Sequence, residues 1–559
     1  MSSEDEYTDS GSEHEPDDSD ISSDSDSVQS EDDSQVDLDL ENPGEEDDEI
    51  VNANPWMRVY PEEQEGEDAL VFNQNSGPQN IPDNCQHPVD YFLLFFTIEL
   101  LNTLVTQTNN YAKKFIDEKL ATLKHKSMVR HWKDVTVTEM KAFITIILNM
   151  GLCRKPTIFA YWSKTRSQHC SWYHDVMGRH RFQLILKFFH FVRTPLPTPG
   201  QPGYNPCARF APLIEVANDR FKYYYKPRQE LLVDESLIGT KNKTQLIQYM
   251  PNKHHHQWGI KIWVLCESVT AYVVAFFVYK GKRGAADDEG GLGLGHKVVI
   301  KLLNMANLLR KGYHVFVDNF FSSIGLVREL FSARTYLTGT IRRNRKGLPA
   351  LVKTQLQPGE SAYSRQGNLL ACSFREKKNQ KNPVIMISTK SKETSRVIQT
   401  RRRGAEGPIE VRKPDVILQY NKYMGGVDCS DMMLYCYLDE RRTLKYWKKV
   451  AFTLISRMVV NSYIIYSQRA PRCVMTRYKF TTQVVDGLAK DALEIRDTPP
   501  GPSSSITIIQ IPDKKERECS VCSDPKGAGR KRSRTMCSVC QKGLHGTCLH
   551  QHKCKKLQK

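Results

Sequence analysis

Apolar residues recur at three- and four-residue spacing along residues 89–105, 143–152 and 182–191. This spacing puts the apolar side chains on one face of an α-helix, so it predicts amphipathic helices that share a core. Thr136 and Glu139 stand three residues apart just ahead of the second stretch, which is the arrangement of an N-terminal capping box. Residues 86–229 are therefore predicted to be the first part of a helical domain.

The hydrophobic period changes after residue 230. Four short apolar or β-branched runs are bounded by polar or glycine-containing segments, a pattern typical of strands in a buried sheet; they lie at 231–234, 260–266, 272–279 and 315–318. Residues 298–309, between the third and fourth runs, have the pattern of a crossover helix. The predicted order is three strands, a helix and a strand, within a mixed α and β domain at 230–335.

The remaining chain divides by composition. Residues 336–414 are richer in Lys, Arg, Gly and Pro and contain only weak strands, so they are predicted to be an insertion into a domain that resumes at 415–437. Residues 438–496 are helical again and form the predicted second part of the helical domain. Residues 497–516 begin with a Pro-, Gly- and Ser-rich stretch and are predicted to be a linker to a cysteine-rich segment at 517–559.

The formal net charge of +15 is distributed unevenly. Residues 1–57 contain 22 Asp or Glu and no Lys or Arg, so the other 502 residues carry +37. Such a surplus favours binding of a polyanion by release of counterions, and nucleic acid is the first candidate. A soluble basic protein without that ligand is the alternative. Residues 1–85 are dominated by acids and Ser and cannot bury enough apolar surface to offset their ordering entropy, so a disordered tail is predicted.

Aromatic and basic residues alternate in 161–166 and 179–188. The pattern is typical of a face that holds a DNA backbone and equally of amphipathic core helices, and both interpretations stay open. No membrane partner is expected, because the most apolar stretch, 92–101, is too short for a bilayer and contains Glu99. The acidic N-terminus has neither a basic n-region nor an apolar h-region. A reducing compartment, cytosol or nucleus, is therefore expected.

Cysteines gather at the C-terminal end of the chain. Eight soft ligands fall within 36 residues, and they occur as four pairs: Cys519 and Cys522, Cys537 and Cys540, His545 and Cys548, and His552 and Cys554. That number fits two tetrahedral Zn²⁺ sites, with the first and third pairs on one ion and the second and fourth pairs on the other. His550 is an alternative to His552. The basic residues between the first two pairs, including Arg530, Lys531 and Arg532, suit phosphate contact or nuclear import, or else form a solvated loop.

Four acids stand where metal chemistry would use them. Asp234 ends the first predicted strand and Asp318 ends the fourth, so neighbouring strands would bring them to one sheet edge. Asp428 and Asp431 are three residues apart and would share a helix face. Carboxylates from separate elements suit Mg²⁺ or Mn²⁺, although an Asp at a strand end is often only a turn or cap residue.

Several further motifs occur in series with these acids, and together they resemble the piggyBac transposase family. The resemblance runs through residues 88–554 and rests on Val233-Asp234-Glu235-Ser236-Leu237, Tyr249-Met250-Pro251-Asn252-Lys253, Trp258-Gly259-Ile260-Lys261, Val317-Asp318-Asn319-Phe320-Phe321-Ser322-Ser323, Gly339-Thr340-Ile341-Arg342-Arg343-Asn344-Arg345, Tyr420-Asn421-Lys422 and Gly425-Gly426-Val427-Asp428 with Asp431. It implies an RNase H-like catalytic domain with an insertion, flanking helical segments for dimerisation and DNA binding, and a C-terminal zinc module that reads the element's ends.

The same resemblance implies a function. Cut-and-paste transposition at TTAA sites in double-stranded DNA is expected: hydrolysis frees a 3′ hydroxyl, which attacks the opposite strand to form a hairpin, and a later attack joins the element to the target. A nuclear homodimer that uses Mg²⁺ or Mn²⁺ for catalysis and carries two Zn²⁺ is expected with it.

The resemblance also assigns roles to individual residues. It makes Asp234, Asp318 and Asp428 the catalytic acids, accompanied by Asp431, and none of the four is replaced. It also implies DNA-binding roles. Tyr249, Pro251 and Lys253 are expected beside the TTAA sequence, and the basic residues Arg342 and Arg345 are expected to hold target DNA. Trp447 is expected near the cleaved end. For Trp447, an aromatic simply packed in its helix is the alternative.

Two other functions compete with transposition. Many piggyBac relatives are domesticated, so a DNA-binding or chromatin protein that keeps the fold and no longer cuts is the first. A zinc-module interaction protein, such as a ubiquitin ligase or histone reader, is the second, but it makes little use of four ordered acids and of the +37 body.

Overall fold

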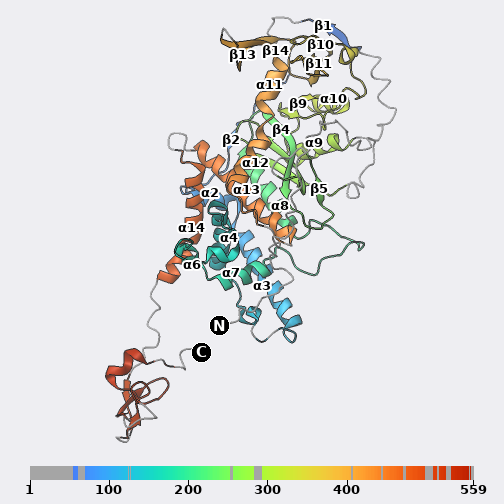
Figure 1. The fold of residues 1–559 in the computed structure, drawn as a ribbon. Coiled ribbons are helices and arrows are strands. Elements are labelled where there is room, and N and C mark those ends of the chain that lie inside the picture. Colours follow the sequence, from blue (N-terminus) through green and yellow to red (C-terminus); the bar gives the residue numbers. More distant parts are fainter. Residues whose placement is uncertain are drawn as a thin grey trace, which may run out of the picture. The chain divides into compact units, whose positions relative to one another are not determined.

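The computed structural model of the chain describes residues 55–60, 70–123, 125, 127–251, 256–281, 293–404, 407–441, 443, 445–469, 474–497, 508–512, 515–523, 531–552 and 554. The chain divides into two compact units, Met1–Ala492 and Leu493–Lys559 (Figure 1). Each unit is described separately below.

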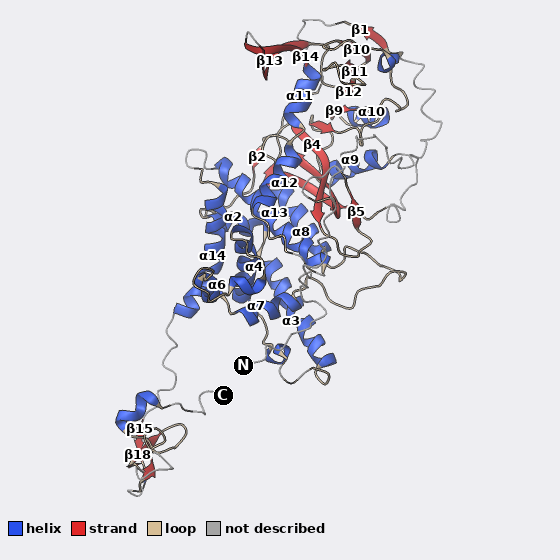
Figure 2. Cartoon of the chain, viewed as in Figure 1, coloured by secondary structure: helices blue, strands red, loops and turns tan. Residues whose placement is uncertain are grey.

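Helices build one part of the first unit (Figure 2). The segment ahead of the sheet supplies α2 (Pro88–Phe95), α3 (Ile98–Lys119), η2 (Met128–His131), α4 (Val137–Leu152), α5 (Ile158–Tyr161), α6 (Ser171–Val176), α7 (Arg179–Phe188) and α8 (Ala211–Tyr224). Two later helices, α13 (Tyr446–Arg469) and α14 (Arg477–Asp497), return to this body, since α13 packs on α2 and α8. Thr145 of α4 donates a hydrogen bond to the Val485 carbonyl of α14 (2.7 Å). Segments far apart in sequence therefore share one helical core.

The first predicted helix is interrupted. The pattern at 89–105 indicated a single helix, but α2 ends at Phe95 and α3 begins at Ile98, with a bend of 64° between them. Thr97 causes the break because its Oγ1 accepts a hydrogen bond from the Leu100 N–H (3.3 Å) and caps α3. The apolar period continues across the bend because both helices face the same core.

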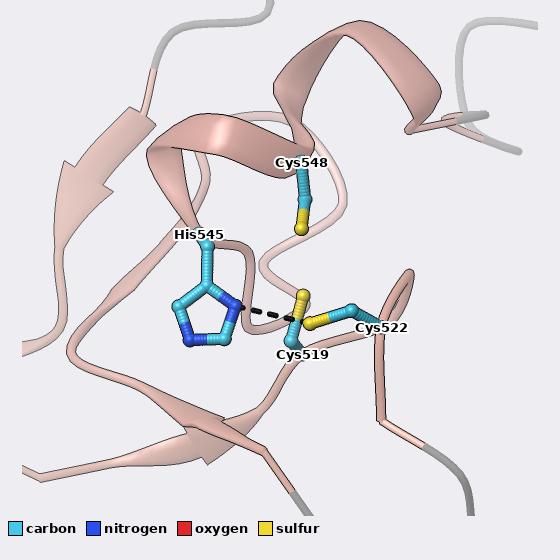
Figure 3. A group of neighbouring side chains, drawn as sticks. All are labelled: Cys519, Cys522, His545 and Cys548. Atoms are coloured by element: carbon cyan, nitrogen blue, oxygen red, sulfur yellow. Dashed lines mark hydrogen bonds between the residues drawn. The ribbon is translucent and has the colours of Figure 1, made fainter.

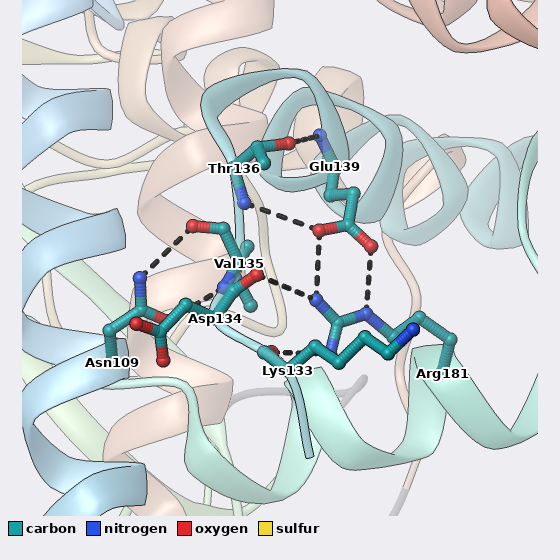
Figure 4. Close-up of polar contacts among 7 residues, drawn as sticks. All are labelled: Asn109, Lys133, Asp134, Val135, Thr136, Glu139 and Arg181. Carbon is teal, nitrogen blue, oxygen red and sulfur yellow. Dashed lines mark hydrogen bonds and ion pairs between the residues drawn. The ribbon is translucent and has the colours of Figure 1, made fainter. Parts of the chain in front are cut away.

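The capping box at the start of α4 is confirmed (Figure 4). Thr136 Oγ1 accepts from the Glu139 N–H, and the Thr136 N–H donates to Glu139 Oε2, both at 3.2 Å. Arg181 of α7 completes the corner by donating from Nε to Glu139 Oε1 (2.8 Å). The aromatic residues of the alternating segments, among them Tyr161, Trp162 and Phe182, are buried. The core interpretation of those segments therefore holds for these aromatic side chains.

A mixed sheet forms the other part of the first unit. Its centre has the order β7-β6-β4-β8-β9, from β4 (Glu230–Gly239), β6 (Trp258–Glu267), β7 (Val273–Val278), β8 (His314–Val317) and β9 (Tyr336–Thr340). The strand β6 pairs antiparallel with both β4 and β7, and β8 and β9 add in parallel beyond β4. This is the topology of an RNase H-like domain, so the predicted fold class and strand order are confirmed.

Several helices pack on the central strands, among them α8 on β7, and a further short strand pairs with β6. The predicted crossover helix is α9 (Leu294–Met305), which packs on β6 and β7, and α10 (Ile324–Ser332) packs on β9. The helix α12 (Gly426–Cys436) packs on β4 and β6. The short β5 (Ile247–Tyr249) pairs with the start of β6.

The predicted insertion at 336–414 begins too early, because β9 lies within it and pairs in parallel with β8. Its Thr and Gly residues weaken the apolar pattern from which a strand is predicted. The strands β12 (Val384–Ser388), β11 (Leu369–Phe374) and β10 (Ser361–Gln366) then continue the sheet outward from β9. Along the chain, η4 (Ala350–Lys353) lies between β9 and β10. After β12, the antiparallel pair β13 (Ser395–Gly404) and β14 (Gly407–Pro414) leads into α11 (Asp415–Tyr423).

The predicted disordered tail also reaches too far. β1 (Met57–Val59) pairs antiparallel with β10, and β2 (Gly77–Pro78) pairs with β3 (Tyr225–Lys226). Trp56 donates from Nε1 to the Gly347 carbonyl (2.9 Å). A few apolar residues after the acidic stretch are enough to anchor the chain here, whereas residues 1–54 lie outside the described part.

The helix α13 is long and apolar enough to cross a membrane by length and composition alone, with a mean hydropathy of 1.3 over its best window. However, 83% of that window is buried inside the protein, which is typical of a core helix. The bent pair α2 and α3 passes the same test only when counted as one span.

The second unit contains short elements around its cysteines. β15 (Ile508–Gln510) pairs with β18 (Thr535–Cys537), β16 (Arg517–Glu518) pairs with β17 (Arg532–Ser533), and η6 (Gly546–Gln551) follows. Its core consists of Cys519, Cys537, Leu544 and Cys554 with the side chains packed on them. The apolar core of this unit is therefore built largely from cysteines.

Candidate active site and metal clusters

Two of the four acids are brought together by the sheet register. Val233 of β4 pairs in parallel with Val317 of β8, so Asp234 and Asp318 are the next residues on neighbouring strands. Asp318 follows the end of its strand, as predicted. Asp234 does not: β4 continues to Gly239 because its other edge stays paired with β6. Asp234 thus lies within a strand, at the point where the parallel partner ends.

The helix α12 brings the other two acids to this place. A Cβ at Gly426 would come within 3.6 Å of Leu232 Cδ2 on β4, and Ser236 Oγ donates to Asp431 Oδ1 (2.8 Å). Leu232, Asp234 and Ser236 lie on one face of β4 because strand side chains alternate. The start of α12 therefore runs along β4 from Leu232 to Ser236, and Asp428, between these two contacts, lies along the stretch that carries Asp234.

Asp318 is held by its neighbours. Its Oδ1 accepts hydrogen bonds from the Asn319 N–H (2.6 Å) and from Thr340 Oγ1 (2.9 Å). Tyr420 of α11 lies close to both sheet acids: burial raises the pKa of Tyr420 to about 12, and the charges of Asp318 and Asp234 add to the rise. A protonated phenol thus stands beside the two carboxylates at neutral pH.

Asp431 has a different environment from the other acids. Its Oδ1 accepts from Arg457 Nη2 of α13 (2.7 Å) as well as from Ser236, and Arg457 Nη1 donates to Ser430 Oγ (2.6 Å). The side chains of Arg457 and Asp431 are only 4% and 15% exposed. This buried ion pair ties α12 to α13, so Asp431 has a structural partner of its own.

Asp431→Asn is therefore expected to destabilise the folded chain by about 3–5 kcal/mol, because it leaves the Arg457 guanidinium buried without its counter-charge. Combining it with Arg457→Met is expected to recover most of the loss, since an apolar side chain removes the unpaired charge. Urea unfolding followed by circular dichroism measures both variants. Asp428→Asn is the comparison, because Asp428 is exposed and its loss is expected to cost at most about 1 kcal/mol. Equal stability of Asp431→Asn and the unmodified chain would contradict the structural role.

Arg342 and Arg345 lie against the turn that follows Asp318. Arg342 donates from Nε to Asn319 Oδ1 (3.1 Å), and Arg345 donates from Nη2 to the Phe320 carbonyl (3.1 Å). Burial, with the charge of Arg342, lowers the pKa of Arg345 below its ordinary value, and Arg345 Nε is buried without a hydrogen-bond partner among the described residues. Two positive charges thus stand against the turn that follows Asp318.

The other predicted DNA contacts are placed differently. Tyr249 is 51% exposed and lies beside Trp258, which is 44% exposed, with ring centroids 4.9 Å apart. Pro251 is exposed in the following turn, and Lys253 lies outside the described residues. Trp447 is 4% exposed and packs on Phe189 and His190. This burial favours the packing alternative for Trp447.

The second unit contains two ligand clusters. Cys519, Cys522, His545 and Cys548 form one, shown in Figure 3, and Cys537, Cys540, His552 and Cys554 form the other. Within each cluster the ligand atoms lie within 4.8 Å of one another. The four pairs group as predicted, the first with the third and the second with the fourth, and His552 belongs to the second cluster. The side chain of His550, the alternative, lies outside the described part.

Hydrogen bonds prepare both clusters for a metal. His545 points Nδ1 at Cys522 Sγ (3.3 Å) and donates from Nε2 to the Arg532 carbonyl (2.9 Å), which fixes its tautomer. Burial tends to raise the pKa of Cys519, but backbone N–H groups, those of Cys522, His545 and Val521, outweigh it and lower the pKa to about 6. Similar bonds lower the pKa of Cys537 to about 7. Burial and the neighbouring cysteines, by contrast, raise the pKa of Cys522 to about 11 and that of Cys540 above its ordinary value. Each cluster offers four soft ligands, which fits a tetrahedral metal ion.

The basic residues of this unit are only partly described. Lys531 and Arg532 are exposed, and Arg530 lies outside the described residues. The Lys531 carbonyl accepts from the Cys519 N–H (2.9 Å). The backbone of this segment therefore supports the cluster while the two side chains face solvent.

Comparison with known proteins identifies the family. A family model described as Transposase IS4 matches residues 87–463. The chain belongs to this family, the piggyBac transposases. Human relatives include PiggyBac transposable element-derived protein 5, 25% identical over 77% of this chain and 80% of its own length, and PiggyBac transposable element-derived protein 3, 22% identical over 82% and 75%.

A solved structure has the same fold as this piggyBac chain. The cryo-EM structure of the piggyBac transposase synaptic complex with hairpin DNA matches with a TM-score of 0.64 at 22% identity. The match covers 84% of this chain and 97% of the other. The fold expected from the piggyBac resemblance is thereby confirmed.

The acid cluster of this piggyBac chain fits a hard divalent cation. Asp234, Asp318 and Asp428 supply only carboxylate oxygens, from a strand, a strand end and a helix, which is the donor set that Mg²⁺ or Mn²⁺ prefers.

Sequence reasoning missed three residues of this site: Thr340, Tyr420 and Arg457. Thr340 and Tyr420 stand inside motifs that carry the piggyBac resemblance, so the motifs were the available signal. Arg457 is a charged residue in the middle of the apolar stretch of α13, which by itself indicates a buried acidic partner but does not say which one.

Proposed function

We propose that the chain is a metal-dependent DNA transposase that cuts and pastes an element at TTAA sites. The observation that carries the proposal is the convergence of Asp234, Asp318 and α12 with Asp428 at one place on an RNase H-like sheet. All acids of the piggyBac pattern are present, and Arg342 and Arg345 stand beside Asp318. Membership of the transposase family supports the proposal.

The residues have distinct roles in this proposal. Asp234, Asp318 and Asp428 would hold Mg²⁺ or Mn²⁺, which when bound activate an attacking oxygen and stabilise a leaving oxygen in phosphoryl transfer. Asp431 holds α12 in place through Arg457. Arg342 and Arg345 bind the DNA backbone beside the acids, which gives affinity and register but no sequence choice. Tyr249 and Pro251, exposed near the edge of the sheet, contact the TTAA segment, and Lys253 is assigned with them.

We propose that the second unit binds two Zn²⁺ and contacts the element's ends through Arg530, Lys531 and Arg532. We further propose a nuclear homodimer as the active form. Light scattering of the purified chain and imaging of a tagged chain in cells would test these two points.

The direct test is excision in Mg²⁺ of a TTAA-flanked element that carries the authentic inverted repeats. The proposed transposase releases the element with hairpin ends and restores TTAA. The second candidate is a domesticated DNA-binding protein, suggested by the names of the human relatives. It would bind the same ends with high affinity and leave both strands intact, and that outcome would replace the first proposal.

DNA binding is expected to depend steeply on salt. A basic body that neutralises about six phosphates loses affinity on the order of a thousandfold between about 50 and about 200 mM salt. Deleting residues 1–54 removes all 22 acids of the N-terminal segment and leaves Trp56 and β1 in place, so binding is expected to tighten. Fluorescence anisotropy across a salt series measures both effects.

The matched control for that deletion is a chain whose residues 1–54 are shuffled, which keeps their length and charge. It is expected to bind like the unmodified chain. Salt-independent binding, or identical affinity after the deletion, would contradict the electrostatic interpretation.

A further inference from the structure

The carboxylate of Asp318 is bonded asymmetrically. Both of its hydrogen bonds, from the Asn319 N–H (2.6 Å) and from Thr340 Oγ1 (2.9 Å), end on Oδ1. Among the described residues, none donates a hydrogen bond to Oδ2. One oxygen therefore fixes the side chain, and the other is left without a donor among the described residues.

The sheet determines where Thr340 lies. Val317 of β8 pairs with Gly339 of β9, so Thr340 and Asp318 are the next residues on the two strands. Gly339 allows this close approach, because a Cβ there would lie 2.6 Å from the Val317 carbonyl oxygen and 2.8 Å from Ser322 Oγ. The turn after Asp318 is itself closed by a hydrogen bond from the Phe321 N–H to the Asp318 carbonyl (3.0 Å). Both partners of the Thr340 bond are thus held by backbone.

Tyr420 extends this arrangement to a second element. Its helix, α11, packs on β4, β9 and β12, and the Tyr420 ring packs against the buried cluster that contains Tyr363, Met386 and Ile417. The Tyr420 side chain lies near Thr340, Asp318 and Asp234, because all three affect the pKa of its hydroxyl. A phenol beside Thr340 can donate to Thr340 Oγ1 while Thr340 donates to Asp318 Oδ1, which would join the three groups in one chain of hydrogen bonds.

We propose that Thr340 and Tyr420 are positioning residues that hold Asp318 with Oδ2 turned toward the divalent cation. The proposal rests on the function proposed above and adds two residues that touch no substrate. Groups that orient a ligating carboxylate restrict it to the geometry that the ion needs, so losing one typically lowers metal affinity about 10–100-fold.

The test is Mn²⁺ binding to the full chain on an element end, measured by electron paramagnetic resonance of free Mn²⁺, together with the Mg²⁺ concentration for half-maximal cleavage. Thr340→Val keeps the side-chain shape and removes the hydroxyl. The Mn²⁺ concentration for half-maximal binding and the Mg²⁺ concentration for half-maximal cleavage are therefore both expected to rise about 10–100-fold. Thr340→Ser keeps the hydroxyl and is expected to stay close to the unmodified chain. Tyr420→Phe keeps the ring and is expected to shift both by about threefold or more.

Thr335→Val is the matched control, because Thr335 is a buried threonine just before β9 whose hydroxyl bonds only the Ala333 carbonyl among the described residues (3.0 Å). It is expected to leave both metal concentrations unchanged. Unaltered Mn²⁺ binding by Thr340→Val would overturn the proposal, and so would an equal shift in Thr335→Val. If Thr340→Val unfolds early, the Tyr420→Phe result decides. An unmodified chain that neither binds Mn²⁺ nor cuts would overturn the proposed function and this inference together.

Discussion

Asp318→Asn is expected to slow strand cleavage on the order of a thousandfold or more. The change keeps the size of the side chain and removes a metal-binding charge, and a loss of about 4 kcal/mol of transition-state stabilisation corresponds to that factor. Asp234→Asn and Asp428→Asn are expected to behave alike, because the three carboxylates come from three elements and none can replace another. Excision of a TTAA-flanked element in Mg²⁺ measures the effect.

DNA affinity and zinc content should survive these changes, which separates a lost site from a lost fold. Asp219→Asn is the matched control: Asp219 pairs with Lys222 on α8, and its side chain is 70% exposed. It is expected to cut at the reference rate. Near-normal cutting by Asp318→Asn would contradict the catalytic role proposed for Asp318. It would also contradict the roles proposed for Asp234 and Asp428.

Removing metal from the second unit is expected to unfold it. A segment this short has little apolar core besides its cysteines, and apparent Zn²⁺ binding energies of about 10–16 kcal/mol in small zinc modules are largely folding energy. Elemental analysis of the full chain is expected to show about two zinc ions per molecule. Circular dichroism of a fragment beginning at Leu493, which keeps β15 paired with β18, should show loss of structure in chelator.

Each cluster combines two Cys/His pairs that are not consecutive along the chain, so variants within one cluster can be tested against the other. His545→Ala and Cys522→Ser alter the same cluster, so each alone and both together are expected to remove one zinc ion and leave the other bound. Cys153→Ser changes an exposed cysteine outside the clusters and is expected to leave both ions in place. Two ions retained by His545→Ala would contradict the cluster, and a chain without zinc would end the assignment of zinc.

The sequence was most informative where one local rule decides the outcome. Thr136 and Glu139 predicted the start of α4 because a capping box needs only residues three apart. The strands that become β4, β6, β7 and β8 were recognisable because a buried strand needs a continuous apolar run. The spacing of Cys and His in pairs predicted both ligand clusters, since an ion needs four ligands and short spacings bring two of them from one turn.

Prediction from the sequence was less complete where residues distant in sequence decide the ends of a strand or the burial of a side chain. Asp234 was expected at a strand end, but pairing with β6 extends β4 past it. The strand β9 was hidden by its Thr and Gly residues, and it forms because β8 offers a free edge. Trp447 could be exposed or packed on its helix until Phe189 and His190 were seen against it.

The sequence by itself determined the family, the fold class, the presence of four acids and the ligand set of the second unit. These follow from local spacing and from residue chemistry, which do not depend on what the rest of the chain does. Only the tertiary structure decided how the acids differ: Asp318 is bonded by Thr340, and Asp431 is paired with Arg457. Those partners lie 22 and 26 residues away along the chain, and the packing of α12 and β9 on the sheet selects them because a buried carboxylate or guanidinium must find a partner.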